Sequence, residues 1–186
     1  MPSRPTRTRP PPTKRHGLLI VYTGDGKGKT TAALGLALRV LGHKEHVCII
    51  HFIKGGWKCG ELSSLARFKK RLTCRVMGCG FTWQSRDISK DIAAARSAWQ
   101  YALRALISHR YGMVILDELT YLMKYRMVST REIVAALRQR RPGLHAVITG
   151  RDAPLSLIRA ADLVTEMREV KHPYNRGTKA QPGIEF

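Results

Sequence analysis

The chain has 186 residues, and its 33 lysines and arginines against 13 aspartates and glutamates give a formal net charge of +20. The length is typical of one domain, and 44% hydrophobic residues are enough to bury a core, which excludes a wholly disordered chain. No apolar run approaches the roughly 20 residues of a membrane-spanning helix, and no apolar signal segment follows the basic N-terminus, so we expect a cytoplasmic protein. The charge indicates an anionic partner, such as nucleic acid, a membrane surface or a phosphate-bearing small molecule.

Residues 1–16 form a separate compositional block with five basic side chains, no acidic one and five of the nine prolines. Such a segment buries too little apolar surface to offset the entropy lost on ordering, so we expect it to be a disordered basic tail. The rest of the chain remains strongly positive without this tail. We expect residues 17–186 to form one domain.

The chain has four cysteines, which are Cys48, Cys59, Cys74 and Cys79. None of them forms a CxxC pair with another. This spacing argues against a zinc ribbon and against a thioredoxin-like redox site, both of which need paired cysteines. We therefore expect free thiols that are incidental to function.

From Gly17 onward, short apolar runs alternate with helical stretches. The expected strands are 18–22, 47–53, 73–77, 113–116, 146–149 and 163–167, and the expected helices are 30–41, 61–70, 87–108, 130–141 and 154–161. Ser129 and Glu132 have the spacing of a capping box, in which the serine hydroxyl accepts from a helical amide and the glutamate reaches back. Continuously apolar strands alternating with helices predict an α/β fold, a mainly parallel sheet with helices on both faces.

A glycine-rich loop lies between the first expected strand and the first expected helix, the context in which such a loop holds phosphate. Its glycines allow a tight turn whose N–H groups point at one centre, and the helix adds its positive dipole end. Lys29 supplies a charge to the phosphate oxygens, and the Thr30 hydroxyl is a magnesium ligand. The candidate ATP-binding residues are Gly24, Asp25, Gly26, Lys27, Gly28, Lys29, Thr30 and Thr31.

This loop departs from the usual phosphate-loop pattern G-x-x-x-x-G-K-[ST] at one position. Gly28, Lys29 and Thr30 fit the pattern, but Thr23 stands where the first glycine belongs. A chance glycine–lysine turn is the alternative, and the correctly placed strand and helix argue against it. Thr23 in place of this glycine would permit an unusual mode of polyphosphate binding.

A second element supports the phosphate loop. The apolar strand at 113–116 ends in Asp117 and Glu118, whose carboxylates can hold a magnesium ion or its waters across from Thr30. Many strands end in acids, so this signal is weak alone and strong beside the loop. Together the two elements predict a P-loop nucleotide-binding protein of the NTPase-like fold.

Further segments, in order along residues 17–186, resemble the P-loop corrinoid adenosyltransferases, the ATP:cob(I)alamin adenosyltransferase family. The segments are 23–33, 51–55, 60–61, 77, 80–83, 116–121, 147–151, 170–173, 179–181 and 183–184. They include His51, Arg151 and His172, whose residue types alone indicate no role.

The resemblance implies an enzyme that transfers the 5′-deoxyadenosyl group of ATP to the Co(I) of a corrinoid such as cobalamin, releasing triphosphate, in adenosylcobalamin biosynthesis or salvage. Co(I) is itself a strong nucleophile, so no protein nucleophile or general base is expected. The protein aligns C5′ with cobalt and stabilises charge on the triphosphate, through Lys27, Lys29, the loop amides and Mg²⁺ on Thr30, Asp117 and Glu118. In this family the triphosphate lies in the reverse sense from P-loop hydrolases, which exposes C5′.

Phe81 and Trp83 stand in a glycine-rich loop, where two aromatic side chains could simply plug the edge of the sheet. By resemblance, they approach the lower face of the corrin and displace its axial base, which makes Co(II) easier to reduce. The resemblance also implies a homodimer and an electron-donating flavoprotein reductase.

Two other functions remain open at this stage. A P-loop kinase for a small metabolite would use the same Lys29, Thr30 and acids, but it would yield ADP where the adenosyltransferase yields triphosphate. A nucleic-acid-binding ATPase would account for the charge, but aromatic residues are only 7% and form no recognition pattern. We expect neither nucleic acid nor a membrane as a partner.

Overall fold

A computed structural model describes residues 16–53, 60–77 and 88–184 of the chain. The expected basic tail therefore lies almost wholly outside the described residues, and so do the loop with Phe81 and Trp83 and the thiols of Cys59 and Cys79. None of the helices in the described ranges is both long and apolar enough to cross a membrane.

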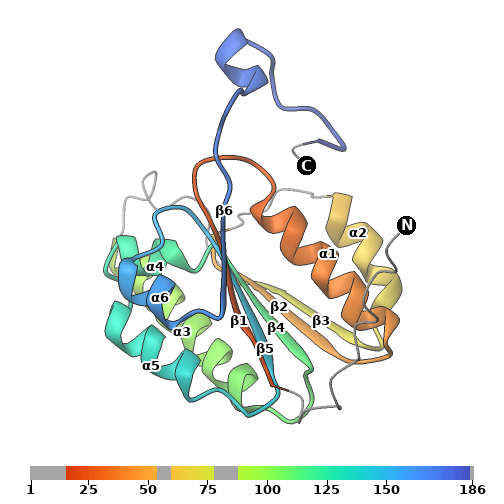
Figure 1. The fold of residues 1–186 in the computed structure, drawn as a ribbon, viewed down its shortest axis with the longest axis vertical. Coiled ribbons are helices and arrows are strands. Elements are labelled where there is room, and N and C mark those ends of the chain that lie inside the picture. The colour runs from red at the N-terminus through yellow and green to blue at the C-terminus, as the bar shows by residue number, and fades with distance from the viewer. Residues whose placement is uncertain (1–15, 54–59, 78–87, 185–186) are drawn as a thin grey trace, which may run out of the picture.

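Six strands form a single sheet in the order β3-β2-β4-β5-β1-β6, and every neighbouring pair is parallel (Figure 1). All their carboxyl ends therefore meet at one edge, where loops can build a site. The strands are β1 (Leu19–Thr23), β2 (Val47–His51), β3 (Leu72–Val76), β4 (Met113–Asp117), β5 (His145–Thr149) and β6 (Leu163–Glu166).

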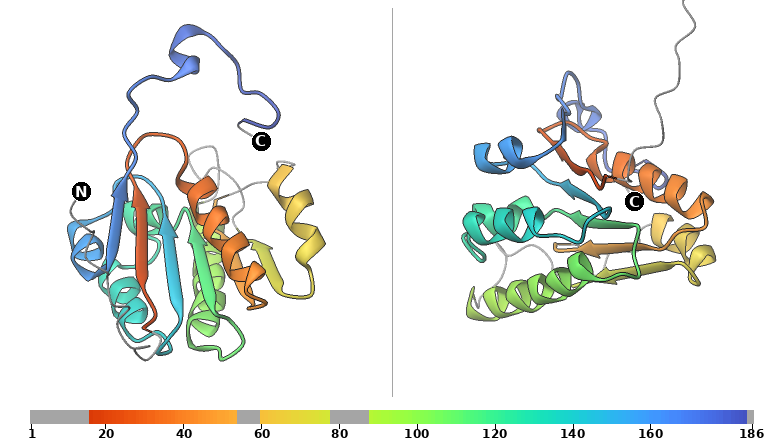
Figure 2. Two further views of the ribbon diagram at one scale, coloured as in Figure 1. Left: turned by 45° about the vertical axis from the view of Figure 1, so that its right-hand side comes forward. Right: turned by 60° about the horizontal axis from the view of Figure 1, so that its bottom comes forward.

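Helices cover both faces of the sheet, as predicted, with α1 and α2 on one face and α3 to α6 on the other (Figure 2). The helices are α1 (Lys29–Gly42), α2 (Gly60–Leu65), α3 (Ile88–Ile107), α4 (Thr120–Lys124), α5 (Thr130–Arg138) and α6 (Leu155–Ala160). Short 3-10 turns follow at Ala66–Phe68 and Pro173–Arg176. The sequence patterns did not predict α4, because its five residues are too few for a helical period to repeat.

The two faces of the sheet bury separate apolar clusters. Under α1, the small side chains of Ala33 and Ala37 let the helix lie close to Ile49 and Ile115. On the other face, α3 contributes Trp99, which is fully buried. Strands β2 and β4 are buried at every position, which explains why they appear as unbroken apolar runs. Each large side chain so buried contributes about 1.5–3 kcal/mol.

Only one of the two hydrogen bonds of the expected capping box forms. Ser129 Oγ accepts from the Glu132 amide at 3.2 Å, as predicted. The Glu132 carboxylate, however, accepts from the Trp99 indole at 2.7 Å, so it joins α5 to α3 instead of reaching back along its own helix. A buried indole N–H needs an acceptor, and Glu132 provides one.

Helix α5 ends at Arg138, three residues before the predicted end, and the arginines that follow at 140 and 141 bind backbone carbonyls. Arg140 donates to Leu137 O at 2.8 Å and to Gly17 O at 2.6 Å. Arg141 donates to Tyr111 O at 2.8 Å. Arg140 also lies 3.5 Å from the Asp162 carboxylate, so part of the positive charge holds the amino edge of the sheet together through contacts within the chain.

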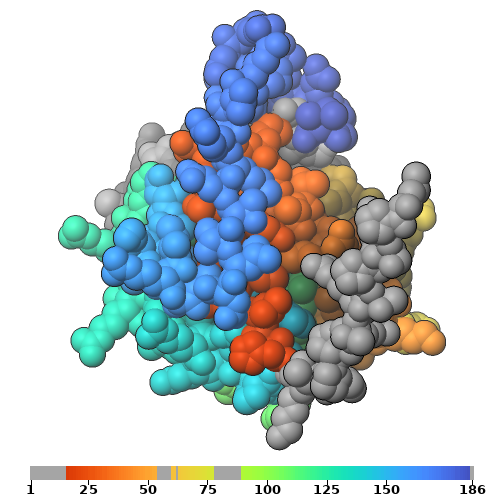
Figure 3. Space-filling model, in the orientation of Figure 1, coloured from red at the N-terminus to blue at the C-terminus, as the bar shows by residue number. Residues whose placement is uncertain are grey.

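The chain beyond β6 leaves the sheet and projects past the phosphate loop, away from the body of the molecule (Figures 1 and 3). Its first residues, Met167 and Arg168, still contact the loop, as described below. The remainder, through Ile184, is almost entirely exposed.

Candidate nucleotide-binding site

The glycine-rich loop lies between β1 and α1 at the carboxyl edge of the sheet (Figure 1). Gly24 and Gly28 have φ of 92° and 109°, in the left-handed region that favours glycine. Lys29 opens α1 and is only 7% exposed, whereas Asp25, Lys27 and Thr31 lie on the surface of the loop and of the first helical turn. The structure therefore brings the eight candidate residues together around one helix start.

The Lys29 ammonium is folded into the loop. It donates to Gly24 O at 2.6 Å and to Gly26 O at 2.8 Å, using two of its three N–H donors. Burial lowers the pKa of Lys29, the carboxylate of Glu118 opposes this, and the charge of Arg151 adds to the lowering. The lysine thus braces the loop, and charges of both signs act on it.

The segment after β6 packs directly on the loop. Gly26 N donates to Met167 O at 2.7 Å, and Met167 N donates to Thr23 O at 2.8 Å. A Cβ on Gly26 would lie 2.7 Å from the Arg168 carbonyl, so this glycine is needed for close chain packing. The expectation that successive loop amides converge on one phosphate centre is therefore wrong for the Gly26 amide, which Met167 already occupies.

Thr23, at the variant position of the phosphate-loop pattern, points its hydroxyl away from the loop. Its Oγ1 accepts from Ala153 N, in the connection between β5 and α6, at 3.2 Å. A glycine there could not make this bond. The departure from the pattern thus ties the phosphate loop to a neighbouring loop of the same edge.

The Asp117 carboxylate, 1% exposed at the end of β4, is the centre of a hydrogen-bond network. Its Oδ1 accepts from Thr30 Oγ1 at 2.8 Å and from Thr149 Oγ1 at 2.7 Å. Its Oδ2 lies 2.7 Å from His51 Nδ1. Burial would raise the pKa of Asp117, but these three partners, His51 foremost, lower it below its usual value.

His51, at the end of β2, is fully buried beside Asp117. Burial opposes the charged imidazole, but the hydrogen bond to Asp117 and a smaller contribution from Cys74 raise the pKa of His51 to about 9. The contacts with Asp117 thus favour the charged imidazolium over the neutral ring. Sequence reasoning assigned no role to His51, because only the strand order shows that β2 lies next to β4.

Glu118 directly follows Asp117 in the chain, and its φ of 61° is uncommon for a residue with a side chain. Its amide donates to Thr149 Oγ1 at 2.9 Å, and the same hydroxyl donates to Asp117. Thr149 thus holds the Asp117 carboxylate and the Glu118 backbone, and the left-handed turn leads straight into α4. Thr149 is a second site residue that the sequence patterns missed, since β5 lies between β1 and β4 only in the folded sheet.

The two cysteines within the described ranges are free thiols, as expected. Cys48 is buried in β2, and burial raises the pKa of its thiol to about 12, so it is not a nucleophile at neutral pH. Among the described residues, no three histidine, cysteine, aspartate or glutamate side chains gather into a metal cluster.

Comparison with known proteins identifies the family. The model of the family described as "ATP:corrinoid adenosyltransferase BtuR/CobO/CobP" matches residues 15–186. The corrinoid adenosyltransferase of Escherichia coli is 44% identical over 170 residues, which cover 91% of this chain and 86% of that protein. That of Pseudomonas aeruginosa is 42% identical, over 91% and 84% of the two chains. The corrinoid adenosyltransferase CobA of Salmonella typhimurium is 41% identical, over 93% and 87%. The chain therefore belongs to the ATP:corrinoid adenosyltransferase family.

Proposed function

We propose that this protein transfers the 5′-deoxyadenosyl group of ATP to the Co(I) of a corrinoid and releases triphosphate. The observation that carries the proposal is the joint placement of Lys29, Thr30 and Asp117 at one sheet edge, in a chain that belongs to this family. A small-molecule kinase would use the same groups, but family membership favours adenosyl transfer.

In the proposed reaction the cobalt electron pair attacks C5′, the C5′–O bond breaks, and its electrons leave with the triphosphate. The reaction needs no base, since no proton has to be removed from the nucleophile. Lys29 and the loop amides other than that of Gly26 stabilise the charge that collects on the departing triphosphate. This electrostatic role suits a lysine already held inside the loop by two carbonyls.

Magnesium fits the donor set around Thr30. The Thr30 hydrogen is donated to Asp117, which leaves the lone pairs of the Thr30 oxygen for a cation. Both Asp117 oxygens already accept hydrogen bonds, so we assign Asp117 to holding Thr30 and the waters of the ion, with Glu118 beside it. When bound, the ion would neutralise charge on the triphosphate.

The remaining expectations from the sequence stay predictions. Phe81 and Trp83 lie outside the described residues, so their expected contact with the lower corrin face stays a prediction. The homodimer, the flavoprotein reductase and the cytoplasmic location also remain predictions, and so does the division into a tail and one domain.

The proposed function is tested by anaerobic incubation with chemically reduced cobalamin and Mg-ATP. The expected result is the absorption spectrum of adenosylcobalamin together with one equivalent of inorganic triphosphate. Formation of ADP without a spectral change would favour the kinase. Tight nucleic-acid binding that survives roughly 200 mM salt would revive the nucleic-acid-binding ATPase, because purely electrostatic binding weakens steeply there.

A further inference from the structure

Two neighbouring strands bring the Cys74 thiol and the His51 imidazole to the same face of the sheet. Strand β3 pairs with β2 so that Val76 lies opposite His51, and Cys74 stands two residues earlier. Side chains two residues apart in a strand point to the same face, here the face that α1 covers. His51 thus has Cys74 of β3 on one side and Asp117 of β4 on the other.

One side of the His51 ring has a hydrogen-bond partner and the other side lacks one. Nδ1 lies 2.7 Å from the Asp117 carboxylate, whereas the buried Nε2 has no hydrogen-bond partner among the described residues. The Cys74 thiol is near enough to act on the ring, because burial lowers the pKa of His51 and contacts with Asp117 and then with Cys74 raise it. A buried polar nitrogen without a partner is costly, so this side of the ring favours a polar group placed beside it.

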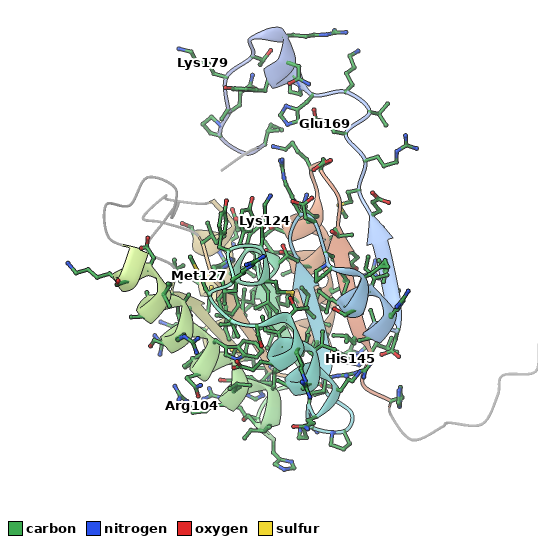
Figure 4. The ribbon with its side chains drawn as sticks, turned by 90° about the vertical axis from the view of Figure 1, so that its left-hand side faces the viewer. Arg104, Lys124, Met127, His145, Glu169 and Lys179 are labelled. Carbon is green, nitrogen blue, oxygen red and sulfur yellow. The ribbon has the colours of Figure 1, made fainter. Side chains whose placement is uncertain are left out.

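The Cys74 side chain is also within reach of solvent, since it is only partly buried. Strand β3 is an edge strand, and the next two residues, Arg75 and Val76, are exposed. The segment with Glu169 and Lys179 follows β6, at the opposite edge, and projects away from the sheet (Figure 4). A small reagent in solution can therefore reach the Cys74 sulfur.

We propose that Cys74 is a modification site, where hydrogen peroxide oxidises the thiol to a sulfenic acid that His51 stabilises. A lone pair of Sγ attacks one peroxide oxygen, the S–O bond forms as the O–O bond breaks, and the thiol proton leaves with the hydroxide as water. Sulfur loses the two electrons that the peroxide gains. The new oxygen gives Nε2 of His51 the partner that it lacks in the reduced protein. Cysteines that oxidise are accessible and stand beside groups such as histidine, which is true of Cys74 and not of the buried Cys48.

The test treats the reduced protein with hydrogen peroxide, traps sulfenic acid with dimedone and locates the adduct at each cysteine by peptide mass spectrometry. We expect at least about 10-fold more adduct at Cys74 than at Cys48, and a thiol reductant added before dimedone should remove it. His51→Asn keeps an amide for Asp117 but has no atom in place of Nε2, so it should lower the Cys74 adduct about 5-fold or more. The matched control is His43→Asn, which removes an exposed histidine at the end of α1 and should leave the adduct unchanged.

Three results would overturn the proposal. The first is an adduct at Cys74 that is absent or no stronger than at Cys48, and the second is equal labelling of Cys74 in His51→Asn and His43→Asn. The third is a disulfide at Cys74 in place of the sulfenic acid. Should His51→Asn melt near the assay temperature, the unmodified protein decides. Its Cys74 sulfenic acid should last at least about 10-fold longer in the folded chain than in urea, and equal lifetimes would exclude stabilisation by His51.

Discussion

Thr30, in the first turn of α1, donates a 2.8 Å hydrogen bond to Asp117 at the end of β4, although β5 separates β4 from the strand that leads into α1. Thr149 of β5 spans this gap, since its hydroxyl donates to the same Asp117 oxygen. His51 completes the set from β2 on the other side. Three strands and a helix start are thus tied to one carboxylate, which makes Asp117 both a structural and a functional residue.

We expect Asp117→Ala to destabilise the fold by about 3–5 kcal/mol, because it leaves the buried His51 charge without its partner. Urea unfolding measures the loss. Asp152→Asn, which breaks an exposed ion pair, should leave the unfolding midpoint nearly unchanged. Equal effects of the two substitutions would contradict the central position given to Asp117.

The stability of the fold should fall as the pH rises through about 9. The pKa of His51 is raised from 6.5 to about 9 in the folded chain, so its contribution is fully present below 6.5 and is lost as the pH rises through 9. Between these values the free energy of unfolding should fall by up to about 3 kcal/mol, since one pKa unit corresponds to 1.36 kcal/mol. The lowered pKa of Asp117 acts at the other end, where stability is lost in acid.

Denaturant titrations in a chelator-containing buffer, from pH 6 to pH 9.5, measure this dependence. His51→Asn is the matched variant, because its amide can still donate to Asp117 but does not titrate. A decline of equal size in His51→Asn would show that another group causes it.

Thr23→Gly restores the usual phosphate-loop glycine, yet we expect it to be harmful. It removes the hydroxyl that accepts from Ala153 N and adds a flexible glycine at the end of β1, costing together about 1–2 kcal/mol. The KM for ATP should also rise, because the two loops are no longer joined. Thr23→Ser keeps the hydroxyl and should behave like the unmodified protein; a Thr23→Ser variant as damaged as Thr23→Gly would rule out the hydrogen bond as the cause.

Gly26→Ala should push the Met167–Arg168 segment off the loop, since the added Cβ would lie 2.7 Å from the Arg168 carbonyl. Overpacking of this kind costs about 1–3 kcal/mol, and ATP binding should weaken with it. Gly35→Ala, within α1 and with no atom within 4 Å of the added Cβ, is the control, and it should stabilise the helix by up to about 1 kcal/mol. Unfolding curves and calorimetric titrations with ATP distinguish the two.

Local patterns in the sequence predicted the strands, the main helices and the position of the phosphate loop. They succeeded because β2 and β4 are buried on both faces and because strand, glycines and helix follow one another along the chain. They could not show that β5 lies between β1 and β4, or that β2 adjoins β4, since strand order is set by packing across the whole sheet. Thr149 and His51 escaped prediction for this reason.

The phosphate loop itself was predicted in place but not in detail. The pattern of glycines indicated amides aimed at phosphate, whereas Gly24 and Gly26 also make room for the chain that returns at Met167. Likewise, the Thr23 departure suggested a change in the grip on phosphate, but its hydroxyl serves a contact with Ala153. Contacts between residues so far apart in sequence leave no local signal.

The bond between Gly26 N and Met167 O also bears on the order in which the protein acquires its activity. The loop is synthesised well before β6 and the Met167–Arg168 segment, which complete its shape. A nascent chain can therefore form most of the sheet before its phosphate loop has its final conformation. ATP binding should accordingly be one of the last properties to appear during synthesis, so that incomplete chains do not bind ATP.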